Sequence, residues 1–160
     1  LLWPKRVISM TLNGAAYFSK NERELFFKSF KPVPKPDTAG KYLHERFALI
    51  KSLFPIFDET LVNSELIGGL RSIDGRNQAF ASLKEQDFAD VLRQVKCPIL
   101  VMSAVNDFFI DKLETIKKDI PSARIARLGK TLIASPELDT QLTVKLLDEF
   151  LIDIELPTRV

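Results

Sequence analysis

Cysteine and histidine each occur once in the sequence, as Cys97 and His44. A single cysteine excludes an internal disulfide, and its place at the start of an apolar stretch predicts a buried structural thiol in a reducing, cytoplasmic compartment. With so few imidazole and thiolate groups, and no aspartate cluster of suitable spacing, the chain offers no set of metal ligands. We therefore expect neither a metal nor a cofactor.

The chain also lacks a surplus of charge of one sign and a long apolar run. Its 23 Lys and Arg residues nearly balance its 21 Asp and Glu residues, which gives a formal charge of +2. Such a balance gives no strong positive electrostatic field that would attract nucleic acid or an acidic membrane surface. No stretch approaches the roughly 18 apolar residues that cross a bilayer, and no signal peptide is visible. We expect neither nucleic acid nor a membrane as a partner.

The composition is that of one globular domain with a hydrophobic core. Hydrophobic residues make up 46% of the 160 positions and charged residues 28%. The first residue is Leu1 rather than Met, so we expect the chain to be part of a longer protein.

The most informative stretch is CPILVMSAVND, residues 97–107. Its continuous apolar run predicts a strand of a parallel sheet that is covered on both faces, because neither face meets water. Pro98 suits the first residues of such a strand. In open α/β sheets, functional groups gather beyond the carboxyl ends of the strands. Asp107 is therefore the leading candidate site residue; the alternative is an exposed loop carboxylate or a cap for the turn at Phe108.

Two more strands and several helices are predicted around this stretch. Residues 7–12 indicate a buried strand that ends at the turn Asn13-Gly14, and residues 123–128 alternate as a strand with one wet face, bounded by Gly129. Capping patterns predict helix starts, at Asn21 with Glu24, Asp37, Asp58, Asp87, Asp111 with Glu114, and Ser135 with Pro136 and Glu137.

The helices between the first two strands form an unusually long insertion. One helical face is predicted to run through Leu43, Phe47, Ile50 and Phe54. A right-handed crossover needs only about a dozen residues, so this insertion should form a substructure over one end of the sheet. The glycine pair Gly68-Gly69 and the dipeptide Asp74-Gly75 are expected to loosen its helices.

The order of these elements resembles the C-terminal half of an α/β-hydrolase, and local motifs support the resemblance. They are Trp3-Pro4-Lys5-Arg6-Val7 before the first strand, the "V-x-x-P-x-L-x-x" pattern of residues 95–102, the loop Asn106-Asp107, the "P-x-A" of residues 121–123, and Pro136-Glu137 followed by Glu149-Phe150-Leu151. The resemblance implies a partial doubly wound parallel sheet of the α/β-hydrolase type with a helical cap. Residues 1–18 and 95–160 would belong to the hydrolase core, and residues 19–94 would be the cap or lid.

By the same resemblance, Asp107 stands at the position of the catalytic triad acid. The family's nucleophile elbow, G-x-S-x-G, is absent from the sequence, and the loop of residues 129–135 contains no histidine, although the family places one there. His44 is more typical of a packed helix flank than of a catalytic base. Lys130 stands near the position of the missing histidine, where a lysine is usually just solvated. The chain alone is therefore expected to be inactive.

The resemblance implies a parent protein that hydrolyses an ester, lactone or thioester of a small apolar substrate, contacted by His44, Phe47 and Phe108. The missing part of the sheet would come from an N-terminal segment or another copy of the chain. A rival interpretation is a catalytically degenerate, hydrolase-like binding protein that has lost the triad histidine. A third is that a loop near Gly129, which held the histidine, is missing from the sequence.

Overall fold

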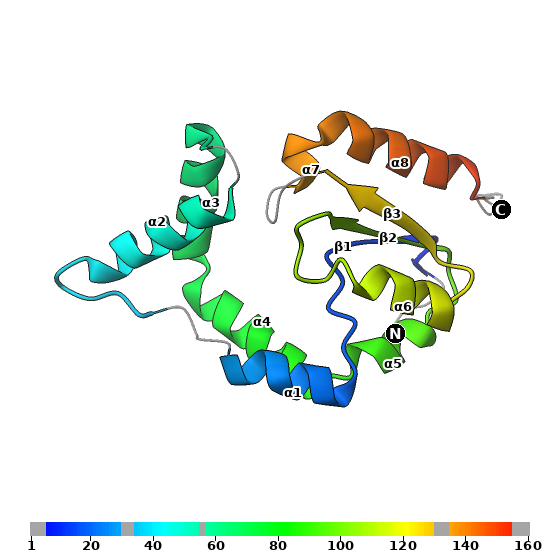
Figure 1. The fold of residues 1–160 in the computed structure, drawn as a ribbon, viewed down its shortest axis with the longest axis horizontal. Helices are drawn as coiled ribbons and strands as arrows, with labels where there is room; N and C mark the ends of the chain where they lie inside the picture. The colour runs from blue at the N-terminus through cyan, green and yellow to red at the C-terminus, as the bar shows by residue number, and fades with distance from the viewer. Residues whose placement is uncertain (1–5, 30–33, 55–56, 130–134, 155–160) are drawn as a thin grey trace. The chain divides into compact units, whose positions relative to one another are not determined.

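The computed structural model describes residues 6–29, 34–54, 57–129 and 135–154, and these form two compact units. The helical unit is Phe18–Asp87, and the sheet unit consists of the described residues before and after it. Figure 1 shows the helices and strands of both units. Whether the helical unit acts as a cap stays a prediction.

The sheet unit is built on three parallel strands in the order β1-β2-β3. They are β1 Met10–Asn13, β2 Ile99–Ala104 and β3 Arg124–Leu128, and the helices of this unit are α5 Phe88–Arg93, α6 Lys112–Asp119, α7 Ser135–Leu138 and α8 Thr140–Ile152. Asn13 is level with Met102, and Ala104 with Leu128. Every residue of β2 is buried, which confirms the strand covered on both faces.

Helices cover both faces of this sheet because β2 sends alternate side chains into two cores. Val101 packs in a cluster with Leu92 of α5 and Ile116 of α6, whereas Leu100 packs in a second cluster with Phe150 of α8. In Figure 1, α8 lies on one side of the sheet and α5 and α6 on the other. Each such side chain contributes about 1.5–3 kcal/mol by leaving water. The α/β class with a parallel sheet is thereby confirmed.

The helical unit contains α1 Lys20–Ser29, α2 Lys41–Leu53, α3 Glu59–Arg71 and α4 Ile73–Glu85. Asp58 caps α3 as predicted, because its Oδ1 accepts the Leu61 N–H at 2.9 Å. The carboxylate of Asp37 accepts the N–H groups of Lys41 and Tyr42 at the start of α2. These backbone bonds, with that from Tyr42 the largest cause, lower the pKa of Asp37.

Several predictions of helix ends were wrong. The capping pair of α1 is Ser19 with Glu22 rather than Asn21 with Glu24, since Ser19 N–H and Oγ both donate to Glu22 Oε2 at 2.9 Å. Asp111 precedes α6 but makes no side-chain capping bond. The last long helix begins at Thr140 rather than Ser135, after the short α7.

The glycines and the apolar face of the helical unit also differ from expectation. Helix α3 continues through Gly68-Gly69, and α4 contains Gly75, so a propensity penalty of about 1 kcal/mol per glycine ends neither helix. Leu43 and Phe47 are 38% and 37% exposed, whereas Arg46 is buried with Ile50. The packed face of α2 is therefore turned toward Arg46.

Two expectations about burial in the sheet unit were also wrong. Val7 and Ile8 are exposed, and β1 begins only at Met10, whose N–H bonds Pro98 O. As an outer strand of the described sheet, β1 is only half-buried. Cys97 is likewise only partly buried because it precedes β2. On α8, Phe150 is buried, whereas Leu151 beside it is 51% exposed.

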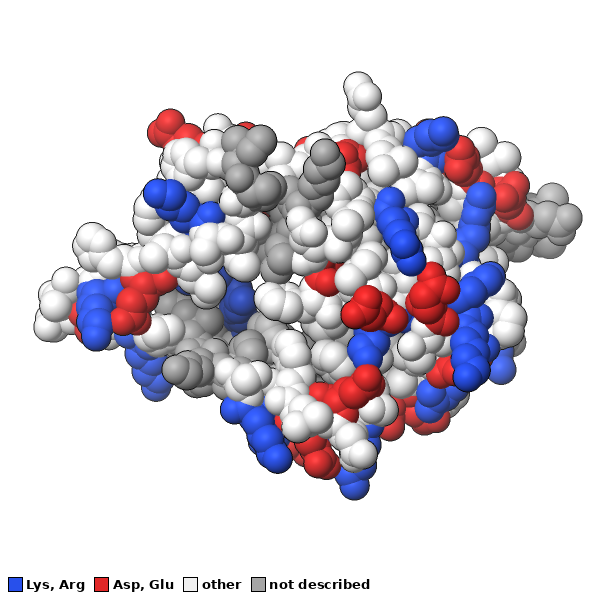
Figure 2. All heavy atoms as spheres, in the orientation of Figure 1, with Lys and Arg blue, Asp and Glu red and all other residues white. Residues whose placement is uncertain are grey.

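Charges of both signs are interleaved on the face shown in Figure 2, as the near balance of the composition implies. Within the described residues, no helix is both long enough and apolar enough to traverse a bilayer.

Candidate functional site

The carboxyl ends of all three strands meet at one edge of the sheet. Gly14, directly after β1, donates its N–H to Met102 O of β2 at 2.9 Å. Val105, directly after β2, donates its N–H to Gly129 O beyond β3 at 2.9 Å. Parallel strands deliver their ends to the same edge, and the register here keeps these ends level. This edge is where the sequence placed the candidate site.

Asp107 lies in the loop at this edge, and its carboxylate is held by two donors. Ser103 Oγ donates to Asp107 Oδ2 at 2.9 Å, and the Phe109 N–H donates to Oδ1 at 3.1 Å. The turn itself closes through the Asp107 N–H, which bonds Ala104 O at 3.0 Å. A fixed carboxylate with lone pairs remaining on both oxygens can orient a further N–H donor, such as an imidazole.

Gly14 gives this carboxylate the room that it occupies. Its φ of +64° lies in the left-handed region, which glycine adopts without a Cβ penalty. A Cβ at this position would lie 2.8 Å from Asp107 Oδ2 and 3.7 Å from the Phe109 ring. The turn after β1 therefore positions the acid of the loop after β2.

Ser103 is a site residue that the sequence did not single out. It is the only hydroxyl in the apolar run of β2, four residues before Asp107, and this spacing was a signal that could have found it. Its side chain is 0% exposed, so it can anchor the carboxylate but cannot reach a substrate. Ser103 is therefore a positioning residue rather than a nucleophile.

A second carboxylate, that of Asp139 between α7 and α8, lies beside the end of β3. It accepts the Gly129 N–H, and a Cβ at Gly129 would collide with it. Because this carboxylate is turned toward Gly129, it does not cap α8. Nothing in the sequence pattern predicted this role for Asp139. Lys130, which stands near the position of the missing histidine, lies outside the described residues.

The three predicted substrate contacts lie in different places. Phe108 follows Asp107 and is 70% exposed, so it presents an apolar ring beside the acid. His44 and Phe47 are exposed residues of α2 in the helical unit. Their part in a substrate site stays a prediction. Among the described residues, no group of three or more His, Cys, Asp or Glu side chains could hold a metal ion.

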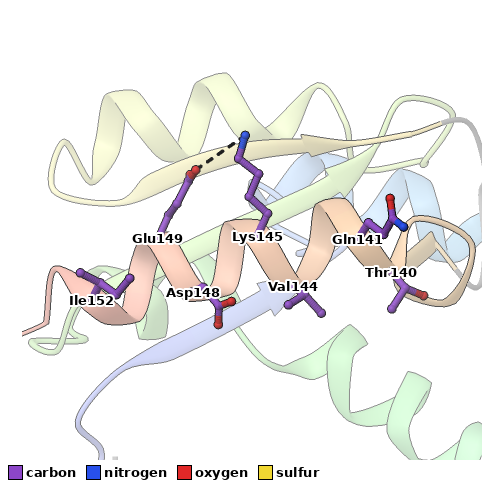
Figure 3. A pocket seen from close by; sticks show the side chains of 7 residues that line it. All are labelled: Thr140, Gln141, Val144, Lys145, Asp148, Glu149 and Ile152. Carbon is purple, nitrogen blue, oxygen red and sulfur yellow. Dashed lines mark ion pairs between the residues drawn. The ribbon is translucent and has the colours of Figure 1, made fainter.

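A shallow hollow lies along α8. Figure 3 shows its lining side chains on successive turns of this one helix, with Lys145 Nζ 3.9 Å from Glu149 Oε1. Val144 and Ile152 give it apolar character, and they are 49% and 81% exposed. It contains no nucleophile beside a base, so it is an uncovered helix face rather than a candidate active site.

Comparisons with known proteins agree with this architecture. No protein-family profile matches the sequence, and no curated protein matches it. The structure is similar to that of a candidate non-heme bromoperoxidase, BpoC, from Mycobacterium tuberculosis, with a TM-score of 0.57 and 13% sequence identity. The match covers 96% of this chain and 60% of that chain. Since BpoC has the α/β-hydrolase fold, this chain is an α/β protein built like part of that fold.

Proposed function

We propose that the chain is the C-terminal part of an α/β-hydrolase-fold enzyme that cleaves an ester, lactone or thioester of a small apolar substrate. In this proposal Asp107 is the acid that orients the catalytic histidine. The observation that carries it is the carboxylate of Asp107 at the end of the central strand, fixed by Ser103 and Phe109. A hydrogen-bonded carboxylate so placed holds an imidazole in the tautomer that can accept the nucleophile's proton.

The remaining catalytic groups would come from outside this sequence. The 160 residues contain neither a G-x-S-x-G elbow nor a histidine in residues 129–135. The chain spans 60% of the length of BpoC, which supports a larger parent protein. The helical unit, Phe18–Asp87, would form the cap, and the exposed ring of Phe108 would contact an apolar substrate.

A second candidate is a hydrolase-like binding protein that has lost catalytic activity. The lack of a histidine in residues 129–135 favours it, because the only histidine, His44, lies on α2 of the helical unit. Such a protein would keep the pocket and the fixed acid but would lack a proton acceptor.

Hydrolysis of p-nitrophenyl esters by the chain alone and by the full product of its gene separates these candidates. We expect the chain alone to show no turnover above its Asp107→Ala variant. In the full product, Asp107→Asn should lower kcat by about 10³–10⁴-fold with little change in KM. The reason is that the catalytic histidine would no longer be held in the tautomer that accepts the nucleophile's proton.

Asp111→Asn is the matched control, since Asp111 is an exposed aspartate of the same loop without a capping bond. It should leave kcat unchanged. Substrate binding without turnover in the full product would favour the binding protein. Full activity in the Asp107→Asn variant would overturn the role of the acid.

A further inference from the structure

The chain passes between its two compact units twice, and both passages are short. The first passage joins Tyr17 of the sheet unit to Phe18 of the helical unit, and the second joins Asp87 to Phe88. At the second passage only two residues separate α4, which ends at Glu85, from α5, which begins at Phe88. Neighbouring residues therefore belong to different units at each passage.

On the sheet side, Tyr17 is fixed by burial and by its hydroxyl group. It is only 3% exposed, and its hydroxyl donates to Asp119 Oδ2 at 2.9 Å and accepts from Arg93 Nη1 at 3.2 Å. Arg93 ends α5, and Phe88 at the start of α5 packs against the hydrophobic cluster that contains Tyr17. The two ends of the sheet unit are therefore held together.

On the helical side, α1 holds both ends of the unit. The ring of Phe18 packs with that of Phe26 in α1, and their centroids are 5.0 Å apart. Arg23 of α1 donates from Nη1 to Gln86 O at 2.8 Å, and the same nitrogen lies 4.0 Å from Asp87 Oδ1. Figure 1 shows α1 beside the last turns of α4. The two ends of the helical unit are therefore also held together.

This anchoring leaves the two peptide links between the units as the points where the backbone can turn. Each residue has only two soft backbone dihedrals, and protein hinges are commonly a few residues at element ends that absorb changes in these angles. Motion of one compact unit against another is the default expectation unless a large apolar interface joins them. Two links define a line, so they permit rotation about that line and restrict rotation about other axes.

We propose that the links Tyr17-Phe18 and Asp87-Phe88 form a two-stranded hinge, about which the helical unit turns as one rigid body. Tyr17 and Arg23 are the anchors of this hinge, since each ties one side of it to its own unit. The inference does not depend on the chemistry at Asp107.

The test is a set of residual dipolar couplings of the backbone amides, measured on the whole chain in a dilute liquid-crystal medium. The couplings of each unit are fitted to the structure of that unit alone. We expect each unit to fit its own structure, with two alignment tensors of different magnitude. One tensor that fits both units would overturn the proposal. So would couplings of the helical unit that fit no single tensor, because that unit would not then move as one body.

Arg23→Ala releases the helical side of the hinge. Hydrogen exchange at the Gln86 amide, which bonds Ser82 O, should become about tenfold faster, because a bond from a charged donor to Gln86 O is lost. Lys28→Ala is the matched control, since Lys28 is an exposed cation in the last turn of the same helix. It should leave the exchange rate and both alignment tensors unchanged.

Tyr17→Phe releases the sheet side, because it removes both hydroxyl bonds and keeps the ring. We expect Tyr17→Phe and Arg23→Ala each to lower the alignment magnitude of the helical unit further, while each unit still fits its own structure. Equal exchange at Gln86 in the Arg23→Ala and Lys28→Ala chains would overturn the role of the anchors. An alignment of the helical unit that neither release changes would also overturn it.

Discussion

Replacing Gly14 by alanine should displace the carboxylate of Asp107 from a distant point in the sequence. Gly14 has a φ of +64°, and an added Cβ would approach Asp107 Oδ2 to 2.8 Å. The substitution therefore has two costs. One is the left-handed backbone of a residue with a side chain, and the other is the movement of a carboxylate that holds two hydrogen bonds.

The two costs differ in size and can be separated. A left-handed alanine costs roughly 1–2 kcal/mol, and weakening the bonds that a charged carboxylate accepts from Ser103 and Phe109 costs roughly 1.5–3 kcal/mol. We therefore expect Gly14→Ala to lower the free energy of unfolding by roughly 3 kcal/mol. In an Asp107→Ala background the carboxylate is gone, and the same change should cost only the roughly 1–2 kcal/mol of the left-handed alanine.

A double-mutant cycle measures this coupling directly. Urea unfolding of the four chains, followed by far-UV circular dichroism at one protein concentration, gives the free energies. Hydrogen exchange of the Phe109 amide adds a local readout, since this N–H bonds Asp107 Oδ1 and should lose protection in Gly14→Ala. An equal cost of Gly14→Ala in both backgrounds would refute the contact between the β1 turn and the acid.

Two further predictions concern the sheet unit. Tyr17 donates to Asp119 at 2.9 Å and accepts from Arg93 at 3.2 Å, and burial, then the bond to Asp119, raises its pKa above 10.0. The stability that ionisable Tyr17 contributes is complete below pH 10 and is lost as pH rises through its higher pKa in the folded chain. Tyr17→Phe should therefore reduce the loss of stability at alkaline pH, as measured by urea unfolding. An unchanged dependence of stability on pH would contradict this prediction. Because Val144 and Ile152 are exposed on α8 and the described sheet has only three strands, the chain alone should self-associate or bind an apolar dye. A monomer by sedimentation that binds no dye would contradict a sheet completed by another segment or copy.

The fold could be read from the sequence where a pattern reflects burial alone. Residues 99–104 are apolar without alternation, and they form the central strand with both faces covered. The strand β3 ends at Leu128, directly before Gly129, the residue expected to bound it, although the burial along β3 does not alternate. Capping was less predictable, because two overlapping pairs, Ser19 with Glu22 and Asn21 with Glu24, have the same spacing. Only the structure shows which pair bonds.

The sequence predicted where the candidate site lies, but not the residues that hold Asp107 there. The end of the central strand pointed to Asp107, but its anchor Ser103 and its neighbour Gly14 follow from the pairing of β1 with β2. A pairing between distant segments leaves no periodic signal in one sequence.

The predicted apolar face of α2 shows the same limit. Ile50 and Phe54 are buried as expected, but Leu43 and Phe47 are exposed, and Arg46 of α2 is buried instead. The guanidinium of Arg46 lies against Gly69 of α3, where an added Cβ would stand 2.8 Å from Nη2, and one sequence carries no sign of this contact.

The two outer strands of the described sheet end in the same way. Gly14 follows β1 and faces the carboxylate of Asp107, while Gly129 follows β3 and donates its N–H to the carboxylate of Asp139. At each end a glycine without a Cβ lets a carboxylate from another loop approach the backbone. The position of the acid thus depends on the glycine opposite as much as on its own loop. A search for relatives of this site should therefore weigh Gly14 together with Asp107, because an aspartate without that glycine could not lie where this one does.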